Sequence, residues 1–197
     1  MLSSLAVIPR LLGVLFYCPP TDPQFQAALG VLDEVKGLLP ASCQAQAAPL
    51  LRQLPALDET LLYPHRVLFI GQGSMPAPPW GSVYLDHEGL LMGDSTLAYR
   101  QFLQQCGLQF TPQQHEPEDH FGLMLMTLAL LTEQQQTAQV QQLLGEHLLP
   151  WAYAYLDALI DSGESVFYQE LGQLARIYLH DLAQTLDVTV ANKPLFR

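Results

Sequence analysis

Apolar residues recur along most of this chain at the three- and four-residue spacing that is typical of helices. After Ser165 they form one long amphipathic stripe, which predicts a helix of several turns. The stripe consists of Val166, Phe167, Leu171, Leu174, Ile177, Tyr178, Leu182 and Leu186. Two further helices are predicted over 137–149 and 151–160, separated at Pro150. Period-two alternation is limited to "SVYLD" (82–86) and "DVTV" (187–190), so the pattern predicts an all-α protein.

The starts of the predicted helices are marked by capping residues and prolines. Asp22 precedes Pro23, which is the pattern of an N-cap followed by proline at the first helical position. Asp94 and Ser95 are expected to cap the next clear helix, and Gly107 is expected to end it. Together with the periodic segments, these signals predict a bundle of roughly ten helices.

The longest non-helical stretch is predicted over 71–81, where "GQGSMPAPPWG" is rich in glycine and proline. Loops of this length within compact domains are usually functional or disordered. Too little sequence precedes the loop to form a second core. We therefore expect residues 1–197 to form a single all-helical domain with one long Gly/Pro-rich loop.

Several features favour a cytoplasmic protein. The apolar N-terminus has no basic residue before its apolar run and no small-residue cleavage site, so we do not expect a signal peptide. The run 121–131 is too short to cross a bilayer, and no stable membrane insertion is expected. Cys18, Cys43 and Cys106 are far apart and form no CxxC motif, which indicates reduced thiols rather than a disulfide framework or a zinc site.

The chain is strongly acidic, with a net charge of −11. A field of this sign disfavours nucleic acid and anionic membranes as partners and favours cationic ones. The same charge is also a common route to solubility, so both interpretations stay open at this point.

Ionisable residues are concentrated in "QQHEPEDHFG" (113–122), directly before the uncharged segment "FGLMLMTLALL". If Pro117 is the first helical residue, Glu116 is the N-cap and the first turn contains Glu118, Asp119 and His120. Carboxylates at this position accept free backbone N–H groups, so capping alone could explain them. Asp119 and His120 point about 100° apart on a helix and are less easily explained in that way.

Three kinds of chemistry are weighed for this segment. His115 and His120 are five residues apart, whereas a two-histidine metal site on a helix needs a spacing of four, so no metal is expected. A hydrolase, with or without a metal, would use Asp119 to orient His120 as a base, but no nucleophile signature accompanies them. "GQGS" lacks the lysine of a phosphate-binding loop, so no nucleotide cofactor is predicted.

The remaining interpretation is a peptide-binding site. An acidic turn beside apolar walls suits a ligand that carries arginine next to a hydrophobic run, because guanidinium groups pair bidentately with carboxylates. Trp80 follows Pro78 and Pro79, and a large aromatic residue on a stiff loop could anchor such a peptide. Trp80 could equally fill the core.

The stretches "PPWGSVYLD", "GDSTLAYRQF" and "HEPEDHFG", together with "RLLGVLFY" and "KPLFR", resemble the TorD/DmsD-like family of redox-enzyme maturation proteins nearly from end to end. The resemblance is greatest to the branch that serves dimethyl sulfoxide reductase. It implies an all-helical cytoplasmic chaperone, not an enzyme. Such a chaperone binds the twin-arginine leader of a molybdenum-cofactor enzyme's catalytic subunit. It delays Tat export until folding and cofactor insertion are complete, and contacts with the Tat translocon are a further open possibility.

The resemblance also implies leader-binding positions. These are Tyr17, Leu68, Phe69, Pro79, Trp80, Gly93, Glu116, Pro117, Asp119 and His120. His65 departs from the branch, which has tryptophan there, and Pro64 before it is awkward in a helix. No metal or other cofactor is expected. The sequence leaves open the client enzyme, the choice between a monomer and a domain-swapped dimer, guanine nucleotide binding, and the effect of His65 on leader preference.

Overall fold

The computed structural model of this 197-residue chain describes residues 6–32, 34–39, 41–53, 59–108 and 116–197. Within these ranges the regular secondary structure is helical, and the one pairing of strand type is an isolated bridge between Trp80 and His120. The predicted all-α fold is therefore confirmed. In the same ranges, no helix has both the length and the apolar character needed to cross a bilayer.

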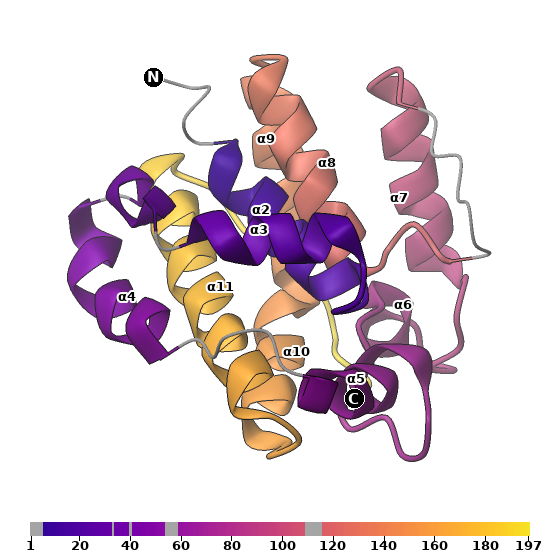
Figure 1. The fold of residues 1–197 in the computed structure, drawn as a ribbon. Coiled ribbons are helices and arrows are strands. Elements are labelled where there is room, and N and C mark those ends of the chain that lie inside the picture. The colour runs from indigo at the N-terminus through magenta and orange to yellow at the C-terminus, as the bar shows by residue number, and fades with distance from the viewer. Residues whose placement is uncertain (1–5, 33, 40, 54–58, 109–115) are drawn as a thin grey trace.

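The helices follow one another closely along the chain. The first half contains α2 (Val7–Tyr17), α3 (Pro23–Leu32), η1 (Glu34–Leu38), α4 (Ala41–Gln53), η2 (Glu59–Leu61), α5 (Leu62–His65), η3 (Arg66–Ile70) and α6 (Gly81–Leu85). The second half contains α7 (Asp94–Gln105), α8 (Phe121–Glu133), α9 (Thr137–Gln142), η4 (Leu143–Leu148), α10 (Leu149–Asp161) and α11 (Val166–Thr185). Figure 1 shows α4 at one edge of the molecule and α7 at the opposite edge.

One cluster of buried apolar side chains connects α2, α3, α4, α7, α8, α10 and α11. α8 contributes Phe121, Leu125, Leu128 and Leu131, each fully buried, as its uniformly apolar sequence predicts for a central helix. The cluster supports a common core for these helices. That the whole of 1–197 forms one domain stays a prediction.

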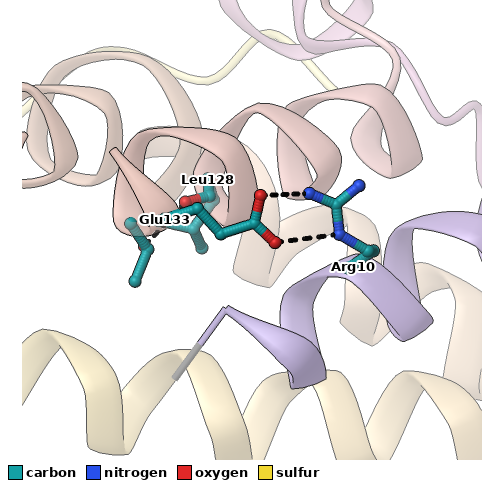
Figure 2. A network of polar contacts seen from close by, with 4 residues as sticks. Arg10, Leu128 and Glu133 are labelled. Carbon is teal, nitrogen blue, oxygen red and sulfur yellow. Dashed lines mark hydrogen bonds and ion pairs between the residues drawn. The ribbon is translucent and has the colours of Figure 1, made fainter. Parts of the chain in front are cut away.

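α2 and α8 pack antiparallel with their backbones in close contact. A Cβ atom at Gly13 would lie 2.7 Å from the carbonyl oxygen of Gly122, and one at Gly122 would lie 2.8 Å from that of Gly13. At the other end of the pair, the Arg10 guanidinium donates two hydrogen bonds to the Glu133 carboxylate, at 3.2 and 2.7 Å (Figure 2). This exposed ion pair adds little stability, and the two glycines are what allow the helix backbones to approach so closely.

The helix predicted over 166–186 is present as α11, and the two helices predicted around Pro150 are also present. α10 begins at Leu149 with Pro150 in its first turn, where a missing N–H is tolerated. The segment before it is α9 continued by the π-helical stretch η4, a variation that the pattern did not predict. Residues 82–85 of the alternating segment "SVYLD" are in α6 and Asp86 follows that helix, whereas "DVTV" is irregular.

Two of the predicted helix boundaries are confirmed. α3 begins at Pro23, and the Asp22 carboxylate accepts the N–H of Gln24 at 2.7 Å. Gly107 follows the end of α7 with a φ of +71°, the left-handed conformation that stops helices.

The capping predicted for α7 is wrong in its chemistry. Gly93 is the N-cap of this helix, and neither Asp94 nor Ser95 caps it through its side chain. The Asp86 carboxylate, from the loop that follows α6, accepts the N–H of Ser95 at 3.1 Å and its hydroxyl at 2.7 Å. The cap therefore comes from a residue outside the helix.

The predicted helix start at Pro117, with Glu116 as its N-cap, is also wrong. α8 begins at Phe121, and His120 is the N-cap whose Nδ1 accepts the Gly122 N–H at 3.1 Å. Residues 116–120 are not helical, because their backbone bonds to a distant segment of the chain. The Gly81 N–H donates to the Asp119 carbonyl at 3.1 Å, and the Phe121 N–H donates to that of Pro79 at 2.7 Å.

The C-terminal residues 187–197 run over the surface without helix and are fixed by hydrogen bonds. The Ala191 N–H donates to the carbonyl of Gly145 in η4, and the Phe196 N–H donates to that of Tyr84 in α6. The Arg197 guanidinium reaches the carbonyl of Met75 at 3.1 Å. This tail thus joins η4, α6 and the irregular segment 71–80.

Candidate functional site

The candidate site is built where the segment before α6 pairs with the segment before α8. Trp80 and His120 form an antiparallel bridge. The Trp80 indole N–H donates to the Glu116 carboxylate, so the two segments are joined through side chains as well as backbone. Residues 36 or more positions apart in the sequence are in this way fixed side by side.

Asp119 lies beneath this bridge at the N-terminus of α6. Its carboxylate accepts the Ser82 N–H at 2.7 Å, and its side chain is only 3% exposed. Burial raises the pKa of the Asp119 carboxyl, and the hydrogen bond from Ser82 opposes that rise. Asp119 therefore stabilises α6, which follows Trp80, rather than the start of its own helix.

Replacing Asp119 with alanine should lower the free energy of unfolding by about 2 kcal/mol, because the Ser82 N–H would be left buried without an acceptor. Asp119→Asn keeps one acceptor oxygen and removes the charge, so its effect should be smaller. Urea unfolding followed by circular dichroism measures both. Equal stability of the alanine variant and the parental protein would show that this hydrogen bond does not support α6.

His120 lies among aromatic side chains and is neutral. Its ring centroid is 5.3 Å from that of Tyr17, 6.0 Å from Trp80 and 6.4 Å from Phe69. Burial is the main cause that lowers the pKa of His120, to about 3, and nearby His65 acts in the same direction. Because Nδ1 accepts the Gly122 N–H, the ring proton is on Nε2.

This geometry does not fit the acid–base pair of a hydrolase. The Asp119 carboxylate is engaged by Ser82, and the Nδ1 of His120 is engaged by Gly122. Each side chain is thus held by a backbone N–H and not by the other. A carboxylate that orients a catalytic imidazole would instead accept its ring N–H.

The three carboxylates of "EPED" have different environments. Glu118 forms a bidentate pair with Arg100 of α7, at 2.8 and 2.6 Å, and Asp119 is buried. Glu116 is half-buried and faces a neutral partner, the Trp80 indole. Burial raises the pKa of the Glu116 carboxyl. Burial also raises the pKa of Tyr17, and the Glu116 carboxylate adds to that rise. Glu116 is therefore the carboxylate of this segment best placed to receive an external cation.

The structure brings together most of the predicted leader-binding residues, but not all of them. Tyr17, Phe69, Trp80 and His120 share the aromatic cluster, and Leu68 is fully buried in the core beside Phe69. Pro79 and Pro117 are buried in the two bridged segments. Gly93 lies elsewhere, against Asp86. A Cβ at Gly93 would lie 2.3 Å from that carboxylate, which explains why a glycine is needed there.

His65 and Pro64 are accommodated without difficulty. Pro64 lies in the first turn of α5, where its missing N–H breaks no helical hydrogen bond. His65 is buried, with its ring centroid 5.1 Å from Phe69 and 6.4 Å from Tyr168. Burial lowers the pKa of His65 to about 4. The aromatic cluster therefore contains two neutral histidines, His65 and His120, both next to Phe69.

Some residues that shape the site were not singled out from the sequence. Gly13 and Gly122 bring Tyr17 next to His120, and Tyr168 of α11 contacts both His65 and Phe69. Glycines within strongly apolar helices are a sequence signal for close helix packing and could have indicated the first contact. The contacts of Tyr168 depend on tertiary structure.

Metal-ligating residues do not gather in the described ranges, where no group of three or more His, Cys, Asp or Glu side chains could hold an ion. His115, which was weighed as a ligand together with His120, lies outside the described residues.

Comparison with known proteins finds relatives that match this chain over nearly its whole length. Residues 36–157 match the model of the family described as the nitrate reductase delta subunit. Relatives from Salmonella paratyphi A and Salmonella typhimurium are each 45% identical over 196 residues, which is 98% of this chain and 95% of theirs. Both are named Tat proofreading chaperone DmsD. The crystal structure of an Archaeoglobus fulgidus protein classed as a redox enzyme maturation protein has the same fold. Its TM-score is 0.60 at 21% identity, over 89% of this chain and 93% of that one.

Proposed function

The chain belongs to the TorD/DmsD-like family of redox-enzyme maturation chaperones, and from this membership we propose that it is a Tat proofreading chaperone that binds a twin-arginine leader. Its relatives of 45% identity carry that function in their name, and the match covers nearly the whole of both chains. The family consists of chaperones, so a hydrolase that uses Asp119 and His120 is not supported.

The observation that carries the proposed site is the pairing of Glu116 with Trp80 at the edge of the aromatic cluster. A twin-arginine leader is a basic segment followed by a moderately hydrophobic one. Glu116 offers a carboxylate to an arginine, and the partly exposed Trp80 and Tyr17 offer aromatic surface to the adjoining hydrophobic residues of the leader. In this proposal Asp119 and His120 act indirectly: Asp119 holds α6, and His120 holds the aromatic rings that present the site.

The client that fits this proposal best is the catalytic subunit of a molybdenum-cofactor oxidoreductase of the dimethyl sulfoxide reductase type. By covering the leader, the chaperone would delay export until the subunit is folded and loaded. A leader must be bound before export, which supports a cytoplasmic site of action. Contacts with Tat translocon components would follow when the leader is handed over.

Isothermal titration calorimetry with a twin-arginine leader peptide should show binding with a negative heat-capacity change, which is the mark of apolar burial. Glu116→Gln should weaken this binding by about tenfold, because it removes the charge that faces the arginine pair. Glu133→Gln is the matched control, since Glu133 pairs with Arg10 near the other end of α8. Its affinity should equal that of the parental protein.

Two peptide controls separate recognition from charge attraction. Lysine in place of both arginines keeps the charge but loses the guanidinium fork, so a modest loss of affinity is expected. A scrambled peptide of the same composition should bind poorly. Equal affinity for the scrambled peptide would contradict leader recognition, and equal affinity of Glu116→Gln and the parental protein would contradict this assignment of the site.

A further inference from the structure

A group of large apolar side chains is exposed on the loop between α6 and α7 and on the first turn of α7. Leu90 is 61% exposed, Leu91 47%, Met92 49% and Leu97 46%. Single exposed apolar residues are common on protein surfaces, but a concentration of four within eight residues marks an interaction surface. These four residues are called the α6–α7 patch below.

The patch is presented by an ordered loop. The Asp86 carboxylate at the start of the loop accepts hydrogen bonds from Ser95 at its end, and Gly93 packs against the same carboxylate. Met92 has a φ of +62°, a conformation that residues other than glycine rarely adopt. The bonds between Asp86 and Ser95 thus hold the two ends of the loop together, and Leu90, Leu91 and Met92 are exposed to solvent.

Acidic residues border the patch along the chain, and the first basic residue after it is Arg100, which pairs with Glu118. No lysine or arginine occurs between residues 67 and 99. Glu88 and Asp94, on either side of Leu90, Leu91 and Met92 in the sequence, are both exposed. A surface that is apolar in the middle and acidic at its borders is complementary to a segment that is apolar and bordered by cations.

The patch is close to the site at Trp80. α6 has five residues and rises about 7.5 Å along its axis. Trp80 is the N-cap of this helix, and the loop with the patch leaves its other end. An extended peptide advances about 3.3 Å per residue, so a few residues of a bound peptide are enough to reach from Trp80 to the α6–α7 patch.

We infer that the α6–α7 patch is a second docking surface for the leader. It takes the hydrophobic run, while Glu116 takes the arginine pair and Trp80 contacts the residues that directly adjoin that pair. This inference rests on the proposed function. It assigns the two halves of the leader to opposite ends of α6, so the two halves should be separable by mutation.

The test uses a double variant, Leu90→Gln with Leu91→Gln, and leaves Met92 unchanged because of its left-handed backbone. Val31→Gln with Val166→Gln is the matched control, since both valines are exposed on other helices. Calorimetry is performed with the whole leader peptide and with a short peptide that contains the arginine pair without the hydrophobic run. The patch variant should bind the whole leader about tenfold more weakly and with a smaller heat-capacity change. It should bind the short peptide as the parental protein does, and the control should match the parental protein with both.

Three results would overturn the inference. If the parental protein binds the whole leader and the patch variant binds it equally well, the patch takes no part, although the proposed function stands. If the parental protein binds no leader, the proposed function fails and the inference fails with it. If sedimentation shows a dimer of the parental protein that the patch variant abolishes, a second copy of the chain covers this surface.

Discussion

Between pH 7 and about pH 5, the free energy of unfolding is expected to fall by about 2 kcal/mol for each of three buried histidines, His65, His120 and His147. Burial is the main cause that lowers their pKa values in the folded state, to about 4, 3 and 4 from an ordinary value of 6.5. As the pH falls below 6.5, the unfolded chain therefore takes up protons that the folded chain does not. Stability is full above pH 6.5 and is lost as the pH falls toward 4.

The measurement is the urea midpoint at pH 7, 6 and 5, followed by circular dichroism. His65→Phe provides the comparison, because it removes one titrating group from the aromatic cluster and should reduce the loss by about 2 kcal/mol. The raised pKa values of Glu116 and Asp119 act in the opposite direction as the pH falls, so the difference between His65→Phe and the parental protein, which share these carboxyls, isolates the contribution of His65. Parallel pH profiles for the variant and the parental protein would contradict the account of His65.

A methyl group at Gly122 should destabilise the protein by about 3 kcal/mol, because the new atom would meet backbone that cannot move aside cheaply. Its Cβ would lie 2.8 Å from the Gly13 carbonyl oxygen and 3.1 Å from the Tyr17 nitrogen. α2 would have to move away from α8, which would also separate Tyr17 from His120. We therefore expect Gly122→Ala to weaken leader binding as well, and calorimetry on the same variant measures that loss.

Gly30→Ala is the matched control for Gly122→Ala. Gly30 lies in α3, and a Cβ there would have no atom within 4 Å. Alanine at that position should stabilise the protein by about 0.5–1 kcal/mol through its higher helix propensity. Thermal melts distinguish the two outcomes. A Gly122→Ala variant as stable as the parental protein would mean that α2 and α8 can separate at little cost.

The parts of the fold that depend on local sequence could be predicted. The start of α3 at Pro23 follows from a cap and a proline that are adjacent in the sequence, and the stripe of α11 follows from its spacing alone. The central position of α8 follows from its long apolar run, which holds no charged residue before Glu133. Each of these features is decided within one helix.

The site was less predictable because distant segments decide its geometry. Glu116 and Pro117 form a persuasive helix start in the sequence, but Trp80 and Pro79 bind this segment in a different conformation. The role of Asp119 at the N-terminus of α6 depends on Ser82, which is 37 residues away. Sequence reasoning could therefore indicate which residues gather at the site, but not which of them is buried and which is accessible.

The attachment of residues 196 and 197 affects when the site can form during synthesis. Arg197 hydrogen-bonds to the carbonyl of Met75, 122 residues earlier, and Phe196 bonds to Tyr84 in the helix that begins after Trp80. A ribosome-bound chain has made the whole Trp80 segment long before it has made these partners. The segment thus receives these supports only when residue 197 has left the ribosome.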